Sequence, residues 1–272
     1  MEKYVYSKKS IVVFFITVIV LSAIMDYVYC AGISIYGVFI LMWMPAVSCV
    51  VANIVNLIEK KEKFNLKLFL NRCGFKKCNL LYILMGIMIP FIYIFIPYRI
   101  YWIIYPDNYA YTGVSLNLVL RDCLLPAIIG VFTNLISATG EEIGWRGAMT
   151  PYLKEKYGRF YGRLVAGLIW GVWHWPLIFL AGYDSGYSYF GAPILGLVTF
   201  CMFTTVMGCL LDFVYEKSGS IWAAAMMHGQ INGFTTVMYL LKPTYQHMMI
   251  FGPLYIGIVS MVPSLLLALY VM

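Results

Sequence analysis

The sequence predicts an all-α, polytopic integral membrane protein with about eight transmembrane helices, forming a single transmembrane domain over residues 1–272. Of the 272 residues, 62% are hydrophobic and only 11% carry a charge. Long apolar runs recur along the whole chain at the length that a helix needs to cross a bilayer. Because backbone polar groups in lipid must bond within the segment, such runs are expected to be helical.

The first three apolar runs lie between the N-terminus and residue 105. A short basic lead precedes Ile11 to Cys30, a run longer than a signal-peptide core, which is therefore expected to remain as a membrane helix. Ile33 to Ile58 forms the second run. The third run, Leu80 to Tyr105, contains Pro90 and Pro97, so a kink or a break is expected toward its far end.

The other five runs begin after Asn117. The fourth extends to about Pro151, and the basic segment Tyr152 to Arg163 that follows it is expected to be a short connector. The last four runs are Leu164 to Ala181, Pro193 to Tyr215, Ser220 to Leu241 and Met248 to Met272.

A basic, amphipathic segment of about residues 59–79 separates the second and third runs. Seven cations lie between Lys60 and Lys77, and leucine and phenylalanine stand between them at helical spacing. This pattern is typical of a helix on an anionic membrane surface. Its place between two spans favours membrane lipid over nucleic acid, and no nucleic-acid partner is expected.

The positions of lysine and arginine predict the orientation in the membrane. With a cytoplasmic N-terminus, 15 of the 19 cations lie on the cytoplasmic side. An even number of spans then places both the N-terminus and the C-terminus in the cytoplasm. The expected location is the cell membrane, crossed several times.

Glu141, Glu142 and Arg146 place three ionisable side chains in the fourth apolar run. Charges inside a membrane segment are costly, so they point to function. On a helix Glu142 and Arg146 share a face, while Glu141 lies about 100° round from Glu142. A buried ion pair that only fixes packing explains Glu142 with Arg146 equally well, but it does not account for Glu141.

Two histidines lie in other runs at a similar depth. His174 is in the fifth run and His228 in the seventh, where Asn232 follows four residues later on the same helical face. At a rise of 1.5 Å per residue, both histidines lie roughly 12–15 Å, and Glu141 about 15 Å, from the inner face. These groups are therefore expected to meet in one pocket open to the cytoplasm. His247 falls in an outer loop and is expected to be solvated.

A carboxylate with imidazoles suits the activation of water. Covalent catalysis is disfavoured because no serine, threonine or cysteine lies at a comparable depth with a base beside it. Glu141, helped by His174, would take a proton from water that attacks a carbonyl group, and His228 and Asn232 would donate hydrogen bonds to the oxyanion.

Three short motifs carry these residues: Glu141-Glu142-x-x-x-Arg146, an aromatic residue four before His174, and His228-x-x-x-Asn232. They resemble the motifs of the intramembrane endopeptidase family that unites type II CAAX prenyl proteases, of the Ras-converting enzyme type, with bacteriocin-processing and immunity proteins. The resemblance covers about residues 119–241, from Val119 to Leu241. The second motif departs from the family, because Trp170 stands where phenylalanine is usual. This replacement is expected to keep the wall of the cavity and to narrow it.

The resemblance implies an eight-helix membrane fold and an intramembrane endopeptidase that removes the C-terminal tripeptide from prenylated CAAX-type proteins or peptides. It also implies the roles of the site residues. Glu141 and His174 would activate water, His228 and Asn232 would form the oxyanion hole, and the supporting residues would be Glu142, Arg146 and Trp170.

Three alternatives stay open. Glu141, His174 and His228 form a two-histidine, one-carboxylate set that can bind zinc, although the absence of a His-Glu-x-x-His pattern favours hydrolysis without a metal or other cofactor. A non-enzymatic membrane scaffold or immunity-type member would keep the fold without needing every polar group. A transporter would use the same acids as a proton relay.

Overall fold

A computed structural model describes residues 6–108, 125–183, 191–234 and 257–272, and within these ranges the chain is helical, with no strand. Four helical stretches are long and apolar enough to cross a membrane: Lys8–Cys30, Gly37–Lys60, Ile128–Ala181 and Ile194–Ser218. The all-α, multi-span fold class is confirmed. The count of eight spans and the side on which the termini lie stay predictions.

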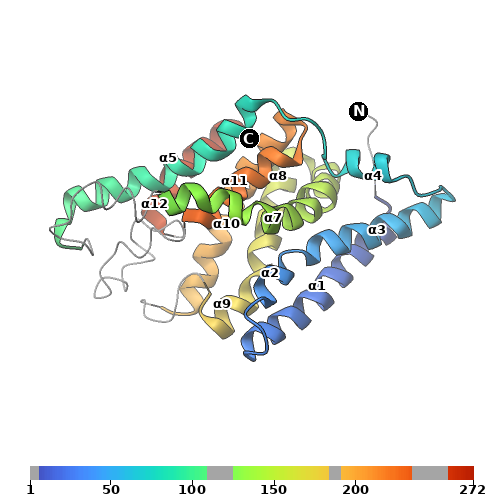
Figure 1. The fold of residues 1–272 in the computed structure, drawn as a ribbon, viewed down its shortest axis with the longest axis horizontal. Helices are drawn as coiled ribbons and strands as arrows, with labels where there is room; N and C mark the ends of the chain where they lie inside the picture. Colours follow the sequence, from blue (N-terminus) through green and yellow to red (C-terminus); the bar gives the residue numbers. More distant parts are fainter. Residues whose placement is uncertain (1–5, 109–124, 184–190, 235–256) are drawn as a thin grey trace.

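The N-terminal part of the chain forms a helical hairpin and a separate long helix. Helix α1 (Lys8–Cys30) packs along α3 (Met44–Lys60), with the short α2 (Gly37–Leu41) between them (Figure 1). The basic, amphipathic segment of about residues 59–79 was expected to form a surface helix, but it contains only the last two residues of α3 and the short α4 (Leu66–Arg72). Helix α5 (Leu80–Ile104) continues past both of its prolines without the break that the sequence allowed, and the 3-10 turn η1 (Pro106–Asn108) follows it.

The C-terminal part carries the candidate site. Helix α7 (Leu125–Gly144), the π-helical turn η3 (Trp145–Met149) and α8 (Thr150–Trp173) follow one another directly, and α9 (Trp175–Ala181) comes next. Helix α7 packs against α11 (Ile221–Gly233), and α8 packs against α10 (Ile194–Ser218). Helix α12 (Ile258–Val271) lies against α10 and α5. In Figure 1, α7, α8, α10 and α11 form the centre of the bundle.

The basic segment Tyr152 to Arg163 contains the turn at which the two helical parts of α8 meet, as expected of a short connector. The one non-helical residue within it is Gly158, with φ of 80°. Its cations are neutralised by α10: Lys154 Nζ lies 2.7 Å and Arg163 Nε 2.6 Å from oxygens of Asp212. Arg163 and Asp212 are both buried, and a buried charge is tolerated when it is paired in this way. Lys154 and Arg163 lie on either side of this turn, so their pairing with Asp212 holds both parts of α8 against α10.

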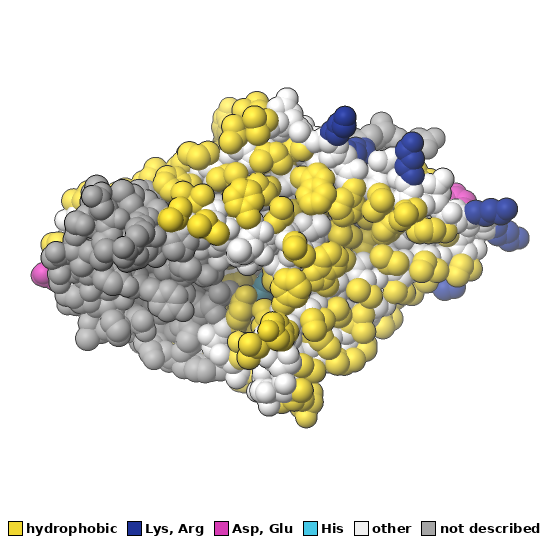
Figure 2. Space-filling view, in the orientation of Figure 1, with side chains coloured by type: hydrophobic (Ala, Val, Ile, Leu, Met, Phe, Trp, Pro, Cys, Tyr) yellow, Lys and Arg dark blue, Asp and Glu magenta, His cyan; other side chains and the backbone are white. Residues whose placement is uncertain are grey.

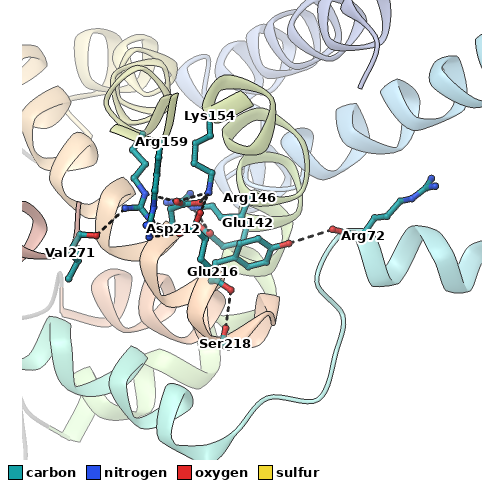
Figure 3. Close-up of polar contacts among 11 residues, drawn as sticks. Arg72, Glu142, Arg146, Lys154, Arg159, Asp212, Glu216, Ser218 and Val271 are labelled. Carbon is teal, nitrogen blue, oxygen red and sulfur yellow. Dashed lines mark hydrogen bonds and ion pairs between the residues drawn. The ribbon is translucent and has the colours of Figure 1, made fainter. Parts of the chain in front are cut away.

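The same ion network joins three helices at one end of the bundle (Figure 3). Glu216 of α10 accepts from Lys154, Arg159 and Arg163 of α8. Arg163 Nη1 also donates to the carbonyl oxygen of Val271 in α12, at 3.2 Å. Helices α8, α10 and α12 are therefore held together by charge as well as by packing.

Pairs of glycines four residues apart bring the site-bearing helices close to their neighbours. A Cβ on Gly144 would lie 2.4 Å from Cβ of Pro45 in α3, and a Cβ on Gly171 would lie 2.7 Å from Cα of Cys201 in α10. Small residues permit such close approach of membrane helices. The pairs are Gly140 and Gly144 in α7, Gly167 and Gly171 in α8, and Gly229 and Gly233 in α11.

The outer surface is strongly apolar. Hydrophobic side chains cover most of the described part of the face in Figure 2, while Lys and Arg gather toward the end where α4 lies. On α1, for example, Ile16 and Ile19 are 57% and 64% exposed. Helices with such an apolar surface suit a lipid environment. The gathering of Lys and Arg at one end is consistent with an orientation that places most cations on one side of the membrane.

Candidate active site

The end of α7 and the turn η3 present two acids, a tryptophan and an arginine to the interior. Glu141, Glu142, Trp145 and Arg146 are all buried, and each is at most 2% exposed. A π-helical turn is rare and is frequently found at functional sites. Here it directly follows the two glutamates and contains both Trp145 and Arg146.

The two oxygens of Glu141 have different surroundings. Oε2 accepts hydrogen bonds from Nε1 of Trp145, at 3.0 Å, and from Nε1 of Trp170, at 2.7 Å. Oε1 lies 3.9 Å from Nε2 of His228, which is too long for a direct hydrogen bond. Oε2 is therefore anchored by two indoles, and Oε1 is the oxygen left for proton transfer.

Glu142 links Arg146 to His228. Arg146 Nη1 donates to Glu142 Oε1 at 3.1 Å, and Arg146 Nε lies 3.1 Å from Oε2. The same Oε1 lies 2.8 Å from His228 Nδ1. An ionised carboxylate can only accept hydrogen bonds, so Nδ1 carries the hydrogen and donates it to Glu142. The Nε2 edge of His228 is thereby turned toward Glu141, and it becomes a donor when the ring is doubly protonated.

His174 lies at the break between α8 and α9. Pro176 stands in the first turn of α9, where a missing N–H costs little. The backbone N–H of His174 bonds to the carbonyl oxygen of Gly171 at 3.0 Å, one residue short of the α-helical partner. The carbonyl oxygen of Trp170 consequently accepts from His174 Nδ1 instead, at 2.9 Å. In the neutral ring, Nε2 is then an acceptor, which suits a base.

Trp170 lies beside both histidines and Arg146 as well as Glu141. Its ring centroid lies 5.2 Å from that of His228 and 6.1 Å from that of His174. The guanidinium carbon of Arg146 lies 5.1 Å from the centre of the same ring, within the range of a cation–π interaction. The indole therefore forms the centre of the cluster rather than only one wall of it.

The structure thus brings six of the seven candidate site residues into one connected cluster, and Figure 2 shows a histidine at the bottom of a hollow on the visible face. The six are Glu141, Glu142, Arg146, Trp170, His174 and His228. The seventh, Asn232, lies one turn beyond His228 on α11 and is half-buried. The expectation for His247 lies outside the described residues.

Sequence reasoning missed Trp145 as a partner of Glu141. The signal was present, because Trp145 follows Glu141 by four residues and residues at that spacing are neighbours on a helix. It also missed the contact between Glu142 and His228, which are 86 residues apart. No pattern among nearby residues predicts a contact between residues so far apart in the sequence.

Among the described cysteines, Cys73 has the shift in pKa that is opposite to that of a reactive thiol. Cys73 lies at the end of α4, outside the long apolar helices, and a hydrogen bond with Cys49 together with burial raises the pKa of its thiol. A catalytic cysteine needs the opposite shift.

The donor set of the cluster suits a zinc ion poorly. Among the residues that the structure describes, no three His, Cys, Asp or Glu side chains are grouped so that they could hold one metal ion. Glu141 Oε2 already accepts two N–H groups, and His228 Nδ1 is bonded to Glu142. Zinc would need Glu141, His174 and His228 to converge at about 2.0–2.2 Å from one point.

Comparison with known proteins identifies the segment that carries this cluster. Residues 123–234 match the family model described as type II CAAX prenyl endopeptidase, Rce1-like. This segment of the chain is similar to the Rce1-like family. The matched segment includes every candidate site residue from Glu141 to Asn232, and the resemblance drawn from the motifs is confirmed.

One curated relative of the chain is the CAAX prenyl protease 2 of Methanococcus maripaludis. It is 33% identical over 105 residues, which amount to 38% of this chain and 38% of that protein. The alignment therefore spans well under half of the length of the relative and well under half of this chain.

Proposed function

We propose that this chain is an intramembrane endopeptidase that removes the C-terminal tripeptide from prenylated CAAX-type proteins or peptides. The observation that carries the proposal is the approach of Glu141 Oε1 to His228 Nε2, at 3.9 Å, inside an Rce1-like segment. A carboxylate whose other oxygen is anchored and whose neighbour is an imidazole is suited to activate water. The name of the archaeal relative supports the class of substrate.

The reaction begins with water attacking the carbonyl carbon of the prenylated cysteine. Glu141 Oε1 takes the proton of this water, and His174 Nε2 accepts a hydrogen bond from it. The carbonyl oxygen becomes an oxyanion, which accepts hydrogen bonds from the doubly protonated ring of His228 and from the amide of Asn232. Glu141 then returns the proton to the amide nitrogen as the C–N bond breaks, which releases the tripeptide and leaves a carboxylate on the cysteine.

Glu142 and Arg146 act through His228. The ionised Glu142 accepts from Nδ1 at 2.8 Å and so fixes which edge of the ring faces Glu141. Its carboxylate therefore lies beside the ring that donates to the oxyanion. Arg146 balances the charge of Glu142 through its two contacts of 3.1 Å. Both residues are positioning residues in this scheme.

The proposed reaction uses no cofactor, and a zinc-dependent version is the alternative. The protein would work in the cell membrane among membrane lipids, with eight spans, cytoplasmic termini and the site open to the cytoplasm. A prenyl chain would enter sideways between helices while the peptide end stays near water. The rival classes are a non-enzymatic scaffold or immunity-type protein and a transporter.

A peptidase assay tests the proposal. Purified protein is incubated with a fluorogenic farnesylated CAAX peptide, with and without a chelator, beside the variants Glu141→Gln and His174→Ala. The control is Glu155→Gln, which neutralises an exposed acid on α8. Cleavage by the wild type and by the control, but not by the site variants, supports the peptidase.

Other outcomes of the same assay favour the alternatives. Loss of cleavage on chelation, with recovery on adding zinc, favours the metal-dependent version. If the folded wild-type protein does not cleave, the peptidase proposal falls and the scaffold reading gains support.

A further inference from the structure

We propose that the indole N–H of Trp170 is a positioning group that holds the carboxylate of Glu141 in its reactive orientation. The inference rests on the proposed function, in which Glu141 takes the proton of water. It goes beyond that proposal by assigning to Trp170 a hydrogen-bonding role that phenylalanine, the residue usual at this place in the resembling family, does not provide.

The hydrogen bond between Trp170 and Glu141 is short and fully enclosed. Nε1 of Trp170 lies 2.7 Å from Oε2 of Glu141, and the two residues are 4% and 1% exposed. An N–H group that donates to a carboxylate away from water gives a stronger bond than one between neutral groups. This one hydrogen bond therefore restrains the orientation of the Glu141 carboxylate more strongly than a bond between neutral groups would.

The bond also determines which oxygen reacts. Trp145 and Trp170 both donate to Oε2, from η3 and from α8, so their bonds approach this oxygen from two different elements. Rotation of the carboxyl group would break both bonds. Oε1 is consequently kept toward His228 Nε2, at 3.9 Å.

The backbone of Trp170 orients the other proposed base. Its carbonyl oxygen accepts from His174 Nδ1 at 2.9 Å, which leaves Nε2 as the acceptor of the neutral ring. One residue thus fixes Glu141 through its side chain and His174 through its main chain. The glycine pair Gly167 and Gly171, which packs tightly on α10, holds this part of α8 in place.

The chain supplies a matched set of variants for the test. Trp170→Phe removes the N–H and keeps an aromatic ring. The benzothienyl analogue of tryptophan at position 170 keeps the two-ring shape and lacks only the N–H, so it separates hydrogen bonding from ring size. The control is Trp175→Phe, because the indole of Trp175 lies outside the cluster and donates to the sulfur of Cys201 at 3.3 Å.

The kinetic readout is the division of the effect between kcat and KM for the farnesylated CAAX peptide. Both changes at position 170 are expected to lower kcat about ten-fold or more and to leave KM within about two-fold, because a bond to a charged group is lost while the ring remains. The control should keep kcat within about two-fold of the wild type. If the benzothienyl analogue keeps the kcat of the wild type, shape alone matters and the inference is wrong. A change confined to KM also overturns it.

A second readout does not depend on activity. The protein has seven tryptophans, and their indole N–H signals can be observed in a ¹H–¹⁵N spectrum, where Trp170→Phe identifies the signal of Trp170. Glu141→Gln is expected to move this signal and to leave that of Trp175 in place. An unmoved Trp170 signal contradicts the bond. If the wild type does not cleave the peptide, the proposed function fails, and the spectrum alone then decides whether Trp170 holds Glu141.

Discussion

Neutralising Glu142 should destabilise the fold as well as stop turnover. The change Glu142→Gln keeps the size of the side chain and removes its charge. Arg146 is only 2% exposed, and both of its contacts with Glu142 are 3.1 Å long. The variant therefore leaves a buried guanidinium without the carboxylate that neutralises it.

The magnitude follows from the cost of an uncompensated buried charge. Removing one partner of a buried ion pair costs about 3–5 kcal/mol. For chains of this size, that loss corresponds to a fall in Tm of roughly 6–20 °C. The cation–π contact of Arg146 with Trp170, at 5.1 Å, remains and keeps the loss toward the lower end of this range.

Thermal unfolding in detergent can be followed with a maleimide dye, since the protein supplies its own buried thiols at Cys49, Cys73, Cys201 and Cys209. The exposed change Glu155→Gln is the control and should leave Tm unchanged. A double variant, Glu142→Leu with Arg146→Met, removes both charges and should recover most of the lost stability. It should not recover peptidase activity, because His228 Nδ1 has lost its acceptor.

Two results would refute this reasoning. If Glu142→Gln melts within about 2 °C of the wild type, far less than a lost buried pair implies, the pair does not stabilise the fold. If the double variant cleaves the peptide as fast as the wild type, Glu142 is not needed to orient His228.

Three further predictions concern packing, charge and metal. Gly144→Ala should destabilise the protein by about 1–3 kcal/mol through overpacking, because the added carbon would lie 2.4 Å from Cβ of Pro45 in α3. The control is Gly147→Ala, whose added carbon meets no atom closer than 3.6 Å and should leave Tm unchanged or higher. Arg163→Met should lower stability by about 1.5–3 kcal/mol, the value of a lost hydrogen bond to a charged group, because Asp212 keeps only Lys154 as a partner. Arg159→Met, at a side chain 52% exposed, should cost less than about 1 kcal/mol. Activity should survive dialysis against a chelator, as measured by the initial rate of peptide cleavage, and a metal-dependent loss would contradict the proposed chemistry.

Local spacing predicted the parts of the site that lie on one helix. Glu142 and Arg146 are four residues apart, and their side chains meet at 3.1 Å as helical periodicity requires. The apolar runs predicted the all-α, multi-span fold because the length of a span is set by the bilayer. Both inferences use only the neighbours of a residue in the sequence, so both can be made without a tertiary structure.

Contacts between helices were beyond this kind of reasoning. The basic segment Tyr152 to Arg163 was expected to be a connector, and it does contain the turn of α8 at Gly158. What the sequence did not reveal is that three of its four cations, Lys154, Arg159 and Arg163, pair with Asp212 and Glu216, some fifty residues further along the chain. A charge pattern gives the polarity of a segment, but it does not reveal a partner on another helix.

Helix α11 explains why Glu141 and Glu142 are adjacent in the sequence. Consecutive side chains on a helix diverge by about 100°, yet both carboxylates lie close to one imidazole, Glu142 at Nδ1 and Glu141 at Nε2. The two nitrogens lie on opposite edges of the ring, so a single histidine can face two diverging neighbours. The distance between α7 and α11 must then be small, and Gly229 makes it so: a Cβ there would lie 2.9 Å from the carbonyl oxygen of Val131. A larger residue at this position would separate both carboxylates from the ring at once, which ties the chemistry of the motif to the packing of the two helices.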